Sequence, residues 1–394
     1  MKKSILLATS AFVVAGAISA TAVDVDLYGQ VNKAVLAYDD GRDTETNFVD
    51  NDKSSTRFGL RGSQALDNGL TASVLIEAEV QSGGNGDSNA IGQNSTVGFA
   101  GTPQPANAAS LNERHTRVGL AGNWGAVFLG RTSTATDGIT EIDIAGADDV
   151  LGSGVERFGG GLGFRRSTNG SLDLDPVTAG VQRVNVSTVF DNLDGIGSRS
   201  HNDRVQTLRY DSPIFNGFQG RIAAAQGGDI DAAVLYSGKI DAFEVKGGLG
   251  YVAFNNGNQV AGAPAAVTNL TANVLEDQWA GSISVKHDQG IGATLAYGEQ
   301  SIDKAAAGVD DPSFLYFKVG YTWDAFEVAA DYTEASDMNV GAADHDATAY
   351  GLAGQYNMGN GVSVAALYRN MDLDVTGTST DAINLYAVNL RVKF

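Results

Sequence analysis

The sequence predicts an all-β fold, a sixteen-stranded antiparallel transmembrane β-barrel, and three features of its 394 residues indicate this. Segments of about ten residues alternate apolar and polar side chains, which is the pattern of a strand with one oily face and one wet face. The turn signals between these segments are alternately short and long, as in barrels with tight turns at one rim. After the N-terminus, no apolar run reaches the roughly 20 residues that a membrane-spanning helix needs.

The first 22 residues are expected to be a secretory signal peptide. Lys2 and Lys3 form a basic start, an apolar stretch follows, and Ala20–Ala22 fits a cleavage site made of small residues. We expect residues 23–394 to form a single barrel domain, because proline is scarce and no Ser-rich or Pro-rich linker interrupts them. Cysteine is absent, so hydrogen-bond closure rather than disulfides must hold this exported chain together.

Seven short turns are predicted, and each contains the Asn, Asp or Gly residues that tolerate positive φ. They are Asp67–Gly69, Asn123–Gly125, Pro213–Gly217, Ile240–Ala242, Asp288–Gly290, Trp323–Ala325 and Asn360–Gly361. Seven short turns and two chain ends on the same side bracket eight hairpins. The sequence therefore predicts sixteen strands, with eight longer loops at the opposite rim.

The last strand shows the alternation most clearly. Its apolar positions are Tyr386, Val388, Leu390, Val392 and Phe394, and polar residues separate most of them. An alternating strand that ends in an aromatic residue resembles the sorting signal of bacterial outer-membrane barrels. This resemblance implies an integral, multi-pass β-barrel in the bacterial outer membrane, whereas the alternative interpretation is the edge strand of a soluble sheet.

Several segments together resemble the general trimeric porins of Gram-negative outer membranes. They are Val25–Gly29, Arg57–Gly62, Gly130–Arg131, Leu208–Pro213, Phe215–Phe218 and the closing strand. The resemblance implies a homotrimer in contact with outer-membrane lipid and lipopolysaccharide, through which small hydrophilic solutes and ions diffuse passively. It also implies short periplasmic turns, long outer loops, and a third loop that folds into the lumen and presents carboxylates opposite a row of arginines.

The residues expected at this constriction follow from the same resemblance. The row of arginines is assigned to Arg57, Arg61, Arg117 and Arg131, and the acidic loop to Asp137, Glu141, Asp143, Asp148 and Asp149. Strict alternation places Arg131 with the apolar side chains of its strand, so a bulge would have to re-aim it toward the pore. The span 132–203 is longer than a simple constriction loop needs, and Val184–Phe190 is a candidate extra strand within it.

Charge and motifs limit the possible functions. The formal net charge of −20 argues against a nucleic-acid partner and suggests a mild preference for cations. The sequence contains no Walker-type phosphate loop, HExxH or Gly-x-Ser-x-Gly motif, so we expect no enzyme activity, metal site or cofactor. A substrate-selective porin, or a barrel that carries an adhesin or an outer-membrane enzyme, remains an alternative. Many of the acids could instead decorate outer loops, where divalent cations would bridge them to lipopolysaccharide.

Overall fold

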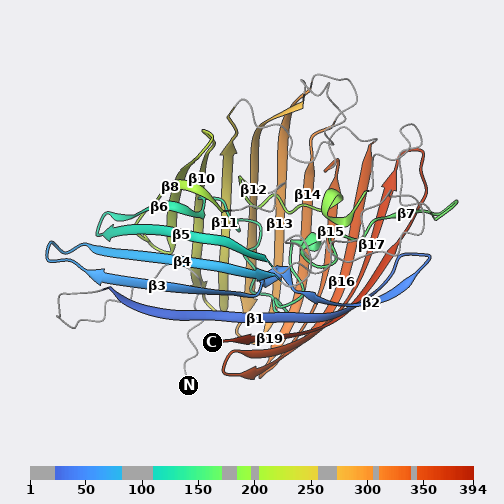
Figure 1. The fold of residues 1–394 in the computed structure, drawn as a ribbon, viewed down its shortest axis with the longest axis horizontal. Coiled ribbons are helices and arrows are strands. Elements are labelled where there is room, and N and C mark those ends of the chain that lie inside the picture. Colours follow the sequence, from blue (N-terminus) through green and yellow to red (C-terminus); the bar gives the residue numbers. More distant parts are fainter. Residues whose placement is uncertain are drawn as a thin grey trace.

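The computed structural model describes residues 23–81, 110–170, 184–196, 204–255, 273–304, 310–338 and 344–394. These residues form one large antiparallel sheet that closes on itself, because its first strand pairs with its last (Figure 1). No helix in the described ranges has the length and apolar character needed to cross a membrane. The predicted signal peptide, residues 1–22, lies outside the described residues and stays a prediction.

The strands of the barrel follow one another around the wall in chain order. They are β1 (Asp24–Asp39), β2 (Thr44–Asp50), β3 (Arg57–Ala65), β4 (Thr71–Gln81), β5 (Ser110–Gly122), β6 (Gly125–Ser133), β8 (Arg204–Asp211), β9 (Phe218–Ala225), β10 (Ile230–Ile240), β11 (Phe243–Ala253), β12 (Asn273–His287), β13 (Ile291–Lys304), β14 (Ser313–Trp323), β15 (Phe326–Ser336), β16 (His345–Gly359), β17 (Val362–Val375) and β19 (Ile383–Lys393). A separate two-stranded ladder joins β7 (Arg165–Arg166) to β18 (Thr380–Asp381).

The second strand of the barrel is interrupted. β3 pairs with the first half of β1 and β2 with the second half, while a single 3-10 turn, η1 (Asp52–Ser54), separates them. The side chains of Gln30 and Asn32 fill the break, since both donate hydrogen bonds to the Ser54 carbonyl, at 2.6 and 2.8 Å. Because β2 and β3 together occupy one position in the wall, the barrel has the sixteen strands that the sequence predicts.

All seven predicted short turns join consecutive strands of the barrel. Asp241, Asp324 and Asn360 have φ values of 51°, 48° and 51°, so the turns do adopt the left-handed conformation for which their residues were identified.

The two faces of the strands have the predicted chemistry. On β14, Phe317 and Val319 point outward and are 45% and 43% exposed, whereas Lys318 between them is fully buried on the inner face. The closing strand follows the same rule, because Tyr386, Val388, Leu390, Val392 and Phe394 are all exposed on the outside. Phe394 extends the ladder by exchanging two backbone hydrogen bonds with Gly29, both of 3.0 Å. The outer surface is therefore suited to contact with acyl chains.

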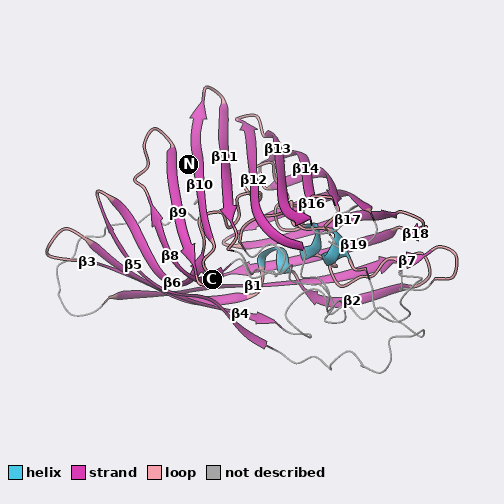
Figure 2. Cartoon of the chain, turned by 90° about the horizontal axis from the view of Figure 1, so that it is seen from above, coloured by secondary structure: helices cyan, strands magenta, loops and turns pink. Residues whose placement is uncertain are grey.

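The expected extra strand at Val184–Phe190 is wrong. Residues Val186–Val189 form a single helical turn, α1, rather than a strand. The amide of Thr188 donates to the Asn185 carbonyl at 2.9 Å, and its hydroxyl accepts from the Asn185 amide at 3.0 Å. These local bonds favour a turn over an extended segment. Figure 2 shows the short helical segments enclosed by the strands of the barrel and not forming part of its wall.

The long loop between β6 and β8 builds an apolar core inside the barrel. Its side chains Phe158, Leu162 and Phe164 are at most 2% exposed. A Cβ added to Gly159 would lie 2.6 Å from the side chain of Leu385 on β19, which shows how closely the loop approaches the wall. One part of the inner face is therefore dry and packed, although the rest of that face is polar.

We predict that the cost of placing a charge on the outer face depends on how deep in the membrane the residue lies. Replacing Leu352, an outward residue in the middle of β16, by arginine should cost about 2–4 kcal/mol of unfolding free energy. The same change at Val362, the first residue of β17 beside a short turn, should cost about 0–1 kcal/mol. Denaturant unfolding in lipid vesicles measures both. Equal costs would contradict the assignment of the outer face to lipid.

Candidate functional site

The first limb of the long loop, residues 136–149, follows the inside of the wall. Successive residues bond to successive strands: Thr136 to Asp231 of β10, Ile139 to Ser282 of β12, Asp143 to Thr294 of β13, Ala147 to Glu327 of β15 and Asp149 to Gln355 of β16. These hydrogen bonds are 2.6 to 3.0 Å long. The loop thus coats the wall from β10 to β19 and narrows the lumen from that side.

Lys318 of β14 holds two of the predicted loop carboxylates. Its ammonium group is fully buried and donates to Asp143 at 2.7 Å and to Asp148 at 3.0 Å. Asp143 also accepts a hydrogen bond of 2.7 Å from Thr294. A buried ammonium between two carboxylates is strongly favoured over any of the three charges alone. Lys318 is not among the constriction residues predicted from the sequence, although the alternation of β14 places it on the polar face.

Glu141 is paired within the loop itself. It lies 2.8 Å from the guanidinium of Arg157, and the amide of Asn192 donates to it at 3.1 Å. Burial raises the pKa of the Glu141 carboxyl, but Arg157 and Lys53 more than offset this, so the pKa falls below its usual value. Burial likewise raises the pKa of Asp148, and Lys318 with Lys53 lowers it further than burial raises it. Both carboxyls are therefore ionised at neutral pH.

Asp149 is buried against the wall and does not face the lumen. Its side chain is inaccessible and pairs with Arg391 of β19 and Ser363 of β17. Its carbonyl accepts a hydrogen bond of 2.7 Å from Asn51, which precedes η1. The structure thus places Asp149 as an anchor of the loop.

A second group of charges lines β3 to β5, on the side of the lumen that the first limb does not coat. Arg114 donates to Glu77 at 2.7 Å and to Glu79 at 2.6 Å, and Arg57 lies 3.7 Å from Glu77. Arg114 was not predicted, because strict alternation puts it on the outer face. A bulge in β5 opposite Glu77 and Ala78 makes it an extra residue and turns it inward.

The neighbouring strands β5 to β9 carry a surplus of positive charge. The guanidinium carbons of Arg117 and Arg209 lie 4.1 and 5.1 Å from the ring centre of buried Phe128. Arg209 and Arg221 share the carboxylate of Asp211 at 2.9 and 3.7 Å. Nε and Nη1 of Arg117 have no hydrogen-bond partner within the described part of the chain.

Arg204 completes this basic wall, which we define as Arg117, Arg204, Arg209 and Arg221. Arg204 donates to His115 at 3.2 Å, so the imidazole accepts and adds no charge of its own to the pair. Asp137 of the loop lies within electrostatic reach of Arg221. Among the residues that the structure describes, these four guanidinium groups therefore face two carboxylates, Asp211 and Asp137. The mutual repulsion that remains would be relieved by an anion.

The other two predicted arginines are placed differently. Arg61 is on the inner face but near the rim, where it is 61% exposed and lies 3.9 Å from Asp26. Arg131 does not face the lumen. It continues the outward row of Leu129, pairs in register with Thr116 and Gln206, and donates to the Glu113 carbonyl at 3.1 Å. No bulge shifts the register of β6 in this ladder, so the side chain is not re-aimed.

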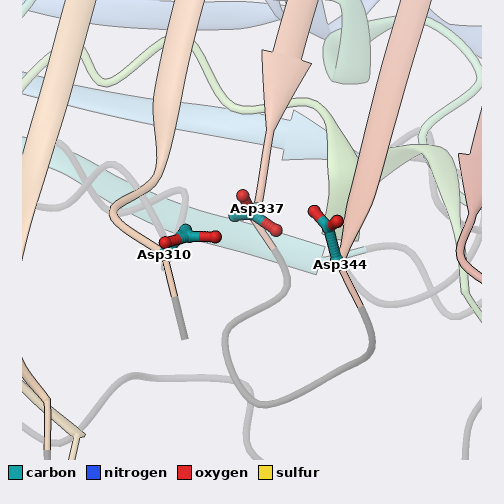
Figure 3. A group of neighbouring side chains, drawn as sticks. All are labelled: Asp310, Asp337 and Asp344. Atoms are coloured by element: carbon teal, nitrogen blue, oxygen red, sulfur yellow. The ribbon is translucent and has the colours of Figure 1, made fainter. Parts of the chain in front are cut away.

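Three carboxylates gather at the outer ends of β14 to β16. Oxygens of Asp310, Asp337 and Asp344 lie within 4.8 Å of one another (Figure 3). Burial raises the pKa of Asp337, the nearby His345 lowers it, and Asp344 and Asp310 raise it again. The net shift is upward, as expected for carboxylates that repel one another.

Comparisons with known proteins agree with this architecture. A family model described as Gram-negative porin matches residues 7–376. Outer membrane porin protein 32 of Delftia acidovorans is 28% identical over 265 residues, which cover 65% of this chain. The matched region spans 57% of that relative's length.

Solved structures share the fold at lower identity. The anion-selective porin from Comamonas acidovorans superposes with a TM-score of 0.55 and 17% identity, covering 95% of this chain and 100% of that one. A loop L8 deletion mutant of OmpT, an outer membrane protein of Vibrio cholerae, gives a TM-score of 0.56 and 14% identity over the same shares of the two chains.

We predict that Lys318 is required to dock the loop. Replacing it by methionine leaves the carboxylates of Asp143 and Asp148 without their shared cation and should cost about 3–5 kcal/mol of unfolding free energy. The matched control is Lys239→Met, which breaks an exposed pair with Asp288 and should cost less than about 1 kcal/mol. Guanidinium unfolding compares the two variants, and similar losses would show that the loop does not depend on Lys318.

Proposed function

The chain belongs to the family of Gram-negative porins and is an integral β-barrel of the outer membrane, and from that premise we propose that it forms a water-filled channel for passive diffusion of small hydrophilic solutes and ions. One observation carries the proposal. The loop coats β10 to β19, whereas charged groups on β3 to β9 keep part of their surface accessible from the lumen. Arg57, Arg114 and Arg221 are 25%, 17% and 14% exposed.

The arrangement of charges supports a transverse electric field in the lumen. The loop carboxylates Glu141 and Asp148 remain partly exposed, at 34% and 48%, on the side opposite the basic wall. Such a field orders water and orients dipolar solutes, so an apolar solute of the same size loses more when it displaces that water. Narrowing by the loop and this field together would select for small, hydrophilic solutes.

We further propose that the narrow part of the lumen favours anions, in contrast to the cation preference expected from the net charge. A net charge of −20 includes carboxylates wherever they lie. Selectivity depends instead on the charge beside the path that is not compensated. Asp143 and Asp149 are closely paired with Lys318 and Arg391, whereas in the described part of the chain the carboxylates that interact with the four arginines of the basic wall are Asp211 and Asp137.

The ion preference can be tested with two arginines that lie on adjacent strands but on opposite faces. In a planar bilayer with a salt gradient, we expect the reversal potential of the unmodified protein to indicate anion preference. Arg117→Gln should shift it toward cations, because it removes a positive charge whose Nε and Nη1 have no hydrogen-bond partner among the described residues. Arg131→Gln should leave it unchanged, because that side chain points outward. A cation-preferring unmodified channel would overturn the proposed selectivity, and absence of any conductance would favour the adhesin or enzyme alternatives.

We also propose that the barrel assembles as a homotrimer through the outer face of β1 to β8. Lys33 of β1 and Asp50 of β2 form an ion pair on this outward face, well inside the barrel's length. The polar row of Thr116, Arg131 and Gln206 lies on the same arc. Charges facing acyl chains cost a few kcal/mol near the bilayer midplane, so a protein partner is the more favourable neighbour. Contact of the remaining outer surface with lipid and lipopolysaccharide is part of this proposal.

Charge reversal at this face tests the assembly. Asp50→Lys places two ammonium groups side by side and should convert trimers to monomers in mild detergent, as measured by analytical ultracentrifugation. Glu299→Lys, on the outward face of β13 at the far side of the barrel, should leave the trimer intact. Trimers that persist in Asp50→Lys, or an unmodified protein that is monomeric, would exclude this interface.

A further inference from the structure

We propose that the long loop between β6 and β8 is an internal clasp that holds the barrel closed at its seam. The seam is the ladder in which Gln30–Asp39 of β1 pairs with Asn384–Lys393 of β19, and it joins the two ends of the sheet. Every other ladder of the barrel joins wall positions that follow one another along the chain, with β2 and β3 counted as one position, whereas the seam joins strands more than three hundred residues apart. The inference does not depend on which ions the channel passes.

The first attachment is the inner clasp, formed by Asn51, Asp149, Ser363, Asn389 and Arg391. Asp149 of the loop pairs with Arg391 on β19 and accepts a hydrogen bond from Ser363 on β17. Asn51, at the end of β2, donates to the Asp149 carbonyl at 2.7 Å and to Asn389 of β19 at 2.9 Å. The same loop residue therefore holds β19 on one side of the seam and the β2 segment, which pairs with β1, on the other.

The second attachment is the outer clasp, formed by Asp40, Asp43, Arg165 and the β7–β18 ladder. Arg165 of the loop donates to Asp40 at 2.7 Å and to Asp43 at 3.3 Å, just beyond the end of β1. Arg165 and Asp40 are almost completely buried, with side chains 4% and 0% exposed. The backbone of the same loop segment pairs with Thr380–Asp381, just before β19 begins. The loop again reaches both sides of the seam.

An apolar layer fills the space between the two clasps. Leu36 and Tyr38 of β1 and Ile383 and Leu385 of β19 are inaccessible to solvent and belong to one cluster with the loop's buried side chains. Gly159, with φ +87°, lets the loop backbone approach Leu385 so closely that a side chain there would clash. Opening the seam would therefore expose apolar side chains as well as unpaired backbone groups.

These attachments distinguish the seam from the rest of the wall. At β12 to β14 the loop is held by hydrogen bonds, such as the one from Ser282 to the Ile139 carbonyl at 2.6 Å, and by the ion pairs of Lys318 with Asp143 and Asp148. At the seam it contributes two buried ion pairs, a short ladder and the apolar cluster. The loop thus reinforces, from both sides, the one ladder whose formation must bring the two ends of the sheet together.

Amide hydrogen exchange of the refolded protein in lipid vesicles tests the clasp. Asp149→Ala removes the centre of the inner clasp and should speed exchange of the β1 and β19 amides at least about tenfold, with β11 and β12 unchanged. Asp143→Ala is the matched control. It removes a loop carboxylate that is bonded to Thr294 of β13 and Lys318 of β14, away from the seam. It should leave β1 and β19 at the rates of the unmodified protein.

A second variant covers the case in which Asp149→Ala fails to fold. Arg165→Ala breaks only the outer clasp and should accelerate exchange at the outer halves of β1 and β19 before their inner halves. Seam amides that exchange at unmodified rates in the folded variants would overturn the proposal. So would equal acceleration by Asp143→Ala, because that result would show general loosening of the barrel rather than a clasp.

Discussion

A strand edge cannot be left facing hydrocarbon, because each unpaired N–H or C=O group there costs several kcal/mol. The whole architecture follows from that constraint. The wall can satisfy its backbone only by closing β1 onto β19, and closure with sixteen strands leaves an interior too wide for wall side chains to fill. The chain meets both requirements with one long loop, which occupies part of the bore with an apolar core and bonds to the strands that complete the ring. Filling the lumen and closing the barrel are thus consequences of the same docking.

Docking a charged loop inside a protein creates a second requirement. A carboxylate moved out of water needs a partner, and the wall supplies one where the loop lies closest: Lys318 for Asp143 and Arg391 for Asp149. Such pairing removes these acids from the electrostatics of the path. Of the two arginines at Phe128, Arg209 pairs with Asp211, whereas Nε and Nη1 of Arg117 have no hydrogen-bond partner among the described residues; the proposed selectivity rests on such uncompensated charge. A count of acidic residues therefore describes solubility and surface charge better than it describes the conduction path.

The parts of the structure that sequence predicts are those set by local rules. The inward or outward direction of a strand residue follows from a period of two, and a tight turn from its Asn, Asp or Gly residues, so the strand count, the seven turns and the exposed row from Tyr386 to Phe394 are confirmed. The failures arise where a local rule is broken or a distant contact decides. A bulge turns Arg114 inward against its alternation, and local bonds at Thr188 convert an apolar segment into a helical turn. That Asp149 is an anchor depends on Asn51 and Arg391, and no spacing in the sequence brings these together.

Strands β1 and β2 make structural contacts on both of their faces. On the inner face of the β1–β2 ladder, Leu36 and Tyr38 pack in the apolar cluster and Asn51 joins the inner clasp, while on the outer face Lys33 and Asp50 form an ion pair that lipid would disfavour. Because successive residues of a strand point to opposite faces, neither set can shift register without displacing the other. The break at η1 has a clear role in this arrangement. It lets the second strand of the barrel turn Asn51 toward the loop and Asn389 while β2 and β3 both keep their ladders with β1. Closure of the barrel by the loop and association of the subunits would then both act on the β1–β2 ladder. Each would stabilise the strand geometry that the other needs.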